Sequence, residues 1–183
     1  MNRIYSLTLL PFLLILIVPV TLKAQEKQFP LVKEFGGVYK IEGAVELPSP
    51  DKSHKIIIEL VSGNKKPDEP SFWINNVARM MNLHGVAGVN KENIQVKVVV
   101  HGGAVLDIVV NERYLTEHEI ENNPNLLLLK YLQEAGAEII VCGQSLLARE
   151  ITTEELAPGT KVALSALTTI SKNVPEGYVL FKF

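Results

Sequence analysis

The chain of 183 residues contains a single cysteine, Cys142. One cysteine cannot form an internal disulfide, so it is a buried bystander, an intermolecular partner or a functional thiol. The four histidines are scattered and form no close pair at zinc-ligand spacing, so we expect no metal centre. No Gly-x-Gly-x-x-Gly follows a strand pattern and no Ser-His-Asp elbow is visible. The sequence therefore predicts no cofactor.

Positive charge is also scarce, with 18 Lys and Arg residues against 20 Asp and Glu residues. Residues 1–24 hold Arg3, Lys23 and no acid, so a chain without them keeps 16 basic and 20 acidic residues, a net charge of about −4. No basic stripe and no nucleic-acid-reading motif remain. We therefore do not expect a nucleic acid as partner.

Residues 1–24 carry the pattern of a secretory signal: an early Arg3, an apolar run over residues 7–20 and a small residue at the end. The alternative is a retained membrane anchor. The apolar run contains Pro11 and Pro19 and is shorter than the ~20 residues that span a bilayer, which favours the cleaved signal. We expect an exported, periplasmic protein without a stable membrane span.

Residues 25–52 are punctuated by Gly and Pro and show no helical period, which predicts an irregular lead-in. Whether it packs on the domain or acts as a tether is left open. From residue 53 onward, apolar runs alternate with helical periodicity. Strands are expected at residues 54–61, 94–100, 138–142, 161–164 and 178–183. Helices are expected at 72–84 with Ser71 as N-cap, 124–135, just after Gln144, and 165–172, with a short one in 104–115 before a polar break at 111–114. This alternation predicts an α/β fold with a mainly parallel sheet of about five strands, covered on both faces.

Cys142 lies where the strand pattern EIIVC meets a helical pattern. In open α/β sheets, ligands bind at the carboxyl ends of the strands. The N–H groups of Gln144 and Ser145 at a helix start would lower the pKa of the thiol, and Gly143 would permit close approach of a partner. The alternative is a small apolar residue that merely ends a strand.

His101 follows the strand at 94–100 and precedes Gly102, so a parallel sheet would place it at the same edge as Cys142. An imidazolium there would lower the pKa of the thiol, and a neutral imidazole would act as its base. The alternative is a loop histidine that bonds only to backbone.

Several other residues are expected at the surface. Asn82 and His84 are interpreted as surface polar residues, with a subunit interface as the alternative. Asp107 and Glu112 are interpreted as solvated charges. The helix at 72–84 carries more large apolar residues than one buried face requires, which favours self-association: Phe72, Trp73, Met80 and Met81.

The segments IQVKVVVHGG, NPN, YLQEAGAEIIVCGQSLLAREIT, LAPGTKVALSALT and EGYVLFKF occur in this order between residues 55 and 183. Together they resemble the DsrE/DsrF-like family. The resemblance implies a three-layer α/β/α domain of flavodoxin-like architecture over residues 53–183, often trimeric or hexameric, and a cysteine that carries sulfur as a persulfide. The expected signal segment removes tRNA thiolation from consideration, and Cys142 need not align with the carrier cysteine of the cytoplasmic relay proteins.

Two functions follow from these observations. The first is an exported carrier that binds or relays sulfane sulfur on Cys142, supported by His101 and by Gly102, Gly143, Gln144 and Ser145, and served by an exported thiol or sulfur donor. The second is a non-catalytic small-ligand-binding or assembly module in which Cys142 is structural. A mixed disulfide with an exported redox partner needs only an accessible thiol, and the sequence does not separate it from the first.

Overall fold

A five-stranded sheet organises residues 25–183, the part of the chain that the computed structural model describes. Its strands are β1 (His54–Leu60), β2 (Ile94–Val100), β3 (Glu138–Cys142), β4 (Lys161–Ala163) and β5 (Val179–Lys182). They lie in the order β4-β3-β2-β1-β5, and every neighbouring pair is parallel. The expected parallel sheet of about five strands is confirmed. The expected signal segment, residues 1–24, lies outside the described residues.

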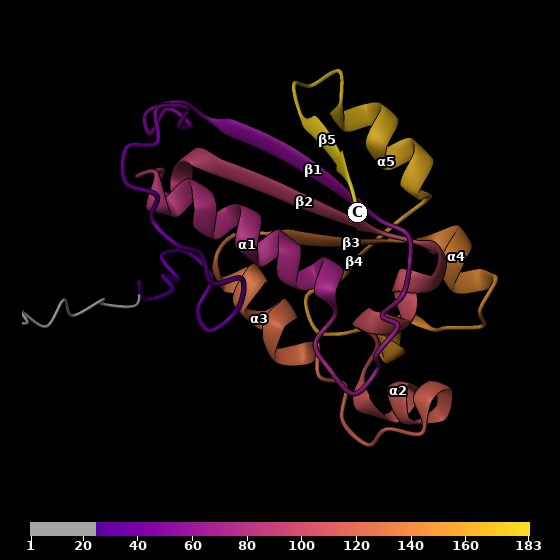
Figure 1. Ribbon diagram of the computed structural model, residues 1–183. Coiled ribbons are helices and arrows are strands. Elements are labelled where there is room, and N and C mark those ends of the chain that lie inside the picture. Colours follow the sequence, from indigo (N-terminus) through magenta and orange to yellow (C-terminus); the bar gives the residue numbers. More distant parts are fainter. Residues whose placement is uncertain (1–24) are drawn as a thin grey trace, which may run out of the picture.

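Helices cover the sheet from both sides (Figure 1). The α-helices are α1 (Phe72–Val86), α2 (Asn111–His118), α3 (Leu126–Glu134), α4 (Gly143–Leu147) and α5 (Ala166–Asn173). Three 3-10 helices connect them: η1 (Lys91–Asn93), η2 (Gly102–Ile108) and η3 (Thr153–Glu155). Figure 1 shows α1 and α3 together on one side of the sheet and α5 on the other. The α/β architecture with helices on both faces is therefore as expected.

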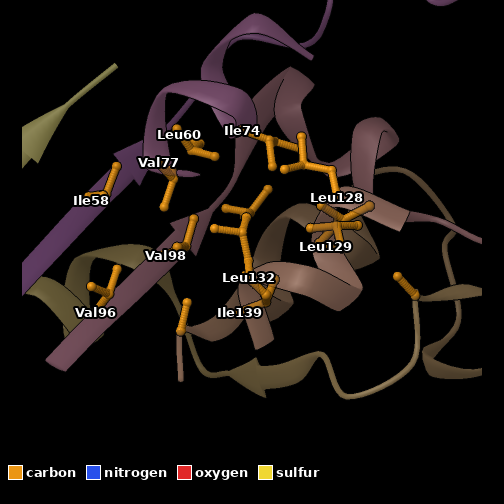
Figure 2. Packing of buried hydrophobic residues seen from close by; sticks show 14 of the residues in the cluster. Ile58, Leu60, Ile74, Val77, Val96, Val98, Leu128, Leu129, Leu132 and Ile139 are labelled. Carbon is orange, nitrogen blue, oxygen red and sulfur yellow. The ribbon is translucent and has the colours of Figure 1, made fainter. Parts of the chain in front are cut away.

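The main core lies between the sheet and the pair α1 and α3. Strand side chains such as Ile58 and Val98 meet Val77 of α1 and Leu132 of α3 in this layer (Figure 2). Ile57, between two residues of this layer, points to the α5 side and joins a smaller cluster there. Burial on both faces explains why β1 is a nearly continuous apolar run, since alternation is lost when a parallel strand is covered twice.

The segment 104–115 differs from the expectation. The apolar part is the 3-10 helix η2, and the supposed polar break begins α2 at Asn111. Tyr114 is fully buried in the middle of this polar stretch and donates a hydrogen bond to the carbonyl oxygen of Pro67 at 2.7 Å. Ser71 does precede α1, yet its side chain makes no capping hydrogen bond. The residues whose polarity suggested a break therefore begin a helix, and the buried Tyr114 side chain fixes that helix to the loop at Pro67.

The lead-in packs on α1 through one buried amide. Asn82 is fully buried, and its Oδ1 accepts hydrogen bonds from the N–H groups of Leu31 at 3.0 Å and Val32 at 2.8 Å. Its Nδ2 donates to the carbonyl oxygens of Val32, Phe35 and Gly36. The interpretation of Asn82 as a surface residue was wrong, because backbone groups of an irregular segment need partners wherever they are buried.

Candidate functional site

Two helices begin beside Cys142. Strand β3 ends at Cys142 and α4 begins at the next residue. In the neighbouring strand, Ala163 is the register partner of Cys142, and the chain then enters α5 at Ala166. Ser165 caps α5 by accepting a hydrogen bond from the N–H of Thr168 at 3.1 Å. The sulfur therefore lies near free N–H groups from two separate elements.

These N–H groups change the acidity of the thiol. Burial raises the pKa of Cys142, which is only 6% exposed. The Ser145 hydroxyl and the backbone amides of Ala166, Ser145 and Gln144 act in the opposite direction and prevail, so the pKa lies below its ordinary value. Hydrogen bonds to the anion stabilise the thiolate, which is the nucleophilic form. Gln144 and Ser145, which the sequence singled out, are both among these donors.

The two glycines serve the chain's own packing. A Cβ on Gly143 would lie 2.8 Å from the carbonyl oxygen of Ala163, so the close approach there is made by β4. Gly102 has a φ of +58°, and its N–H donates to Ser145 Oγ at 3.2 Å. Its carbonyl oxygen accepts from Arg149 Nε at 2.9 Å. Gly102 therefore holds the hydroxyl that supports the thiolate.

His101 is paired with a carboxylate. Its Nε2 lies 2.8 Å from Glu59 Oε1, and Lys182 Nζ lies 3.2 Å from Glu59 Oε2. The register Val100–Val141, continued by one residue, places His101 opposite Cys142. His101 is nevertheless absent from the described groups that lower the pKa of the thiol. The structure therefore brings both residues to one edge of the sheet, with the imidazole held by Glu59.

Glu59 is a member of this edge that sequence reasoning missed. It is 9% exposed at the carboxyl end of β1. Burial raises its pKa, but hydrogen bonds from His101 and Lys182, with their charges, hold it below its ordinary value. The available signal was an acidic residue inside an otherwise apolar strand, since such a residue is buried only with partners. Lys182 and Arg149 carried no comparable signal.

Two further expectations concern charges. Glu112 is exposed as expected, but Asp107 is only 2% exposed, so its interpretation as a solvated charge was wrong. Both carboxylate oxygens of Asp107 accept from the N–H of Asn64 at 3.1 Å. His84 is half-buried and its Nδ1 lies 2.9 Å from the Met80 carbonyl oxygen. Within residues 25–183, no group of three His, Cys, Asp or Glu side chains is placed to hold a metal ion.

The fold and the site together define the class of protein: a parallel α/β domain with one cysteine at the carboxyl edge of its sheet, beside the starts of two helices. The chain belongs to the DsrE/DsrF-like family, whose sequence profile matches residues 55–183.

Solved structures agree on the fold. The protein of unknown function MTH1491 from Methanobacterium thermoautotrophicum aligns with a TM-score of 0.55 at 16% identity, over 72% of this chain and 100% of its own. The ychN protein from E. coli aligns with a TM-score of 0.50 at 14% identity, over 70% of this chain and 99% of its own. No curated protein matches the sequence significantly. In residues 25–183, no helix is both long and apolar enough to cross a membrane.

Proposed function

We propose that the protein binds and relays sulfane sulfur as a persulfide on Cys142. The observation that best supports this proposal is the set of hydrogen-bond donors around the thiol: one hydroxyl and three backbone amides, which lower its pKa. Membership of the DsrE/DsrF-like family supports a role related to sulfur relay. A carrier needs a thiolate to accept sulfur and donors that stabilise the anion, and this site supplies both.

The transfer is a displacement at sulfur. The Cys142 thiolate attacks the outer sulfur of a polysulfide or persulfide donor, a new S–S bond forms at Cys142, and the donor's S–S bond breaks with its electron pair leaving on the donor thiolate. No oxidant is consumed. The register of β2 and β3, continued by one residue beyond Val100, sets His101 opposite Cys142, so its imidazole is the candidate base for the thiol proton. Glu59 fixes the ring through Nε2.

The same proposal includes the cellular setting. Export to the periplasm rests on the pattern of residues 1–24, and an exported thiol or sulfur donor is then the partner. Self-association into a trimer or hexamer is supported by exposed apolar side chains on the α5 side of the sheet, among them Leu164, Leu167 and Leu180.

A second candidate function is favoured by the burial of the sulfur. Cys142 is packed against Ile57, Val99, Ala166 and Tyr178, as a structural cysteine would be. In that case the protein is a non-catalytic ligand-binding or assembly module.

Intact mass spectrometry separates the two functions. The protein is incubated with polysulfide, freed of small molecules and weighed, with the Cys142→Ser variant as control. The carrier function predicts added sulfur atoms on the wild type, removed by a thiol reductant, and none on the variant. Unchanged mass of a folded wild type, together with iodoacetamide alkylation at pH 6.5 no faster than in an unfolded control, would establish the structural role.

A further inference from the structure

Three lysines surround a hollow on the face of the sheet that α5 covers. The hollow has a volume of about 290 Å³ and is lined by Lys97 of β2, Lys161 of β4 and Lys172 of α5. Its floor includes Ile140, two residues before Cys142 on the same strand face, and Ala163, the register partner of Cys142. The hollow is therefore lined by the register partner of Cys142, although neither Cys142 nor the residues that donate to its sulfur line it.

Lys97 is held in place by neutral partners. Its Nζ donates to Asn173 Oδ1 at 2.7 Å and lies 4.8 Å from the centre of the Tyr178 ring. Asn173 is 3% exposed, and its own Nδ2 donates to the carbonyl oxygen of Thr169 at 2.7 Å. Neither partner is a carboxylate, so no negative charge is paired with this half-buried lysine.

The local charge is opposite to that of the whole chain. Only Lys161 of the three lysines forms an ion pair with a described residue, Glu138 Oε2 at 2.8 Å. Three ammonium groups thus face one carboxylate, in a chain of net charge −2. Charges of one sign that line a concave surface concentrate the opposite ion there.

We propose that this hollow binds a small, doubly charged oxyanion, the sulfate-like or phosphate end of a ligand. The volume suits a tetrahedral anion with room for a short extension, and the excess of two positive charges matches its charge. Because Ala163 lines the hollow and is the register partner of Cys142, a longer ligand bound there would extend toward Cys142. That extension rests on the proposed sulfur transfer, whereas binding of the anion does not.

The test titrates the isotopically labelled full chain with sodium sulfate and, separately, sodium phosphate, while sodium chloride keeps the ionic strength constant. Backbone amide NMR signals report binding, and those of Thr168, Thr169 and Asn173 should shift with saturation. Lys161→Gln and Lys172→Gln should each weaken the affinity about five-fold, as expected for removal of one exposed charge. Lys130→Gln on α3, on the opposite side of the sheet, is the matched control and should leave the affinity unchanged.

The two anions distinguish the source of the ligand: tighter sulfate binding indicates a sulfur oxyanion, and tighter phosphate binding a phosphorylated compound. Shifts that match those in chloride alone, or an affinity equal in the wild type and in the Lys161 and Lys172 variants, would overturn the proposal. Both variants change exposed side chains, so their folding is checked by the unshifted remainder of the spectrum. Anion binding retained in Cys142→Ser while polysulfide adds no mass to the wild type would reject the sulfur carrier and keep the anion site.

Discussion

The Ser145 hydroxyl is the only side-chain donor among the groups that lower the pKa of Cys142. It is placed by the N–H of Gly102, which donates to the same oxygen. Ser145→Ala removes this donor, so the thiolate loses one hydrogen bond and the pKa of the thiol rises. We expect the midpoint of iodoacetamide alkylation against pH to move to higher pH.

Ser145→Thr keeps a hydroxyl at the same position and serves as the control, with a midpoint close to that of the wild type. An alanine variant that alkylates with the wild-type pH profile would show that the backbone amides alone set the acidity of the thiol.

Asp107 makes the stability of the fold depend on pH. Burial raises its pKa from 3.8 to about 6, and the amide of Asn64 and the hydroxyl of Ser71 offset only part of this. The folded state therefore holds a proton that the unfolded state releases earlier. The resulting stability is complete below about pH 4 and is lost as the pH rises through about 6, up to roughly 3 kcal/mol.

Asp107→Asn stays neutral at every pH, and its amide oxygen can still accept from Asn64. We expect the free energy of unfolding, measured with urea at pH 4 and at pH 7.5, to fall less with pH in this variant than in the wild type. Glu112→Gln, at an exposed position, should keep the wild-type dependence. If the free energy of unfolding changed equally with pH in the wild type and in Asp107→Asn, a protonated Asp107 carboxyl in the folded state would be contradicted.

At the scale of elements, Asn82 joins the lead-in to α1. Its five hydrogen bonds reach only backbone groups of the lead-in: one each to Leu31, Phe35 and Gly36, and two to Val32. Asn82→Ala leaves these buried groups without partners, so we expect a loss of roughly 3 kcal/mol in the free energy of unfolding. Limited proteolysis should then cut between residues 25 and 40 faster than in the wild type.

Asn93→Ala is the matched control, because its amide also reaches the lead-in but makes one exposed hydrogen bond, to the carbonyl oxygen of Pro50. It should cost less than about 1 kcal/mol. Equal effects of the two substitutions would mean that the lead-in is held mainly by its apolar contacts.

How far the sequence predicted these elements depends on whether the signal was local. The strands of the sheet and the junction at Cys142 were predictable because apolar runs and helix starts are local patterns. Asn82 and Asp107 were assigned wrongly, and Glu59 was not singled out, because the partners that justify burying each of them lie far away in the sequence. The pairing of His101 was missed for the same reason: its edge of the sheet was predictable, but its carboxylate partner on another strand was not.

At the scale of the whole molecule, the two faces of the sheet are covered unequally. The α1 and α3 side holds nearly all of the buried apolar residues, whereas the α5 side has a cluster of five. Around α5, large apolar side chains remain exposed, including Leu167 at 79%, Leu164 at 73% and, on β5, the register partner of Ile57, Leu180 at 42%. Exposed apolar side chains gathered on one face commonly mark a protein interface.

The expectation from sequence placed this surplus on α1 instead. Met81 is fully buried, and Trp73 and Met80 pack against the main core, so only Phe72 of the four large side chains is exposed on α1. If the protein self-associates, a substitution on α5 would prevent it when the interface lies there, and a substitution on α1 would prevent it when the interface lies on α1. The arrangement of exposed side chains favours the α5 face.

We therefore expect Leu167→Glu to dissociate the proposed oligomer in sedimentation velocity at micromolar concentration, because a charge placed in an apolar interface loses its hydration without gaining a partner. Phe72→Glu, which puts the same charge on a comparably exposed side chain of α1, should leave the sedimentation coefficient unchanged. The reverse pattern would move the interface to α1, where the sequence alone had suggested it. A wild type that sediments as a single species of monomer mass would remove the interface from both faces, and the apolar side chains around Leu167 would then be available to a different protein.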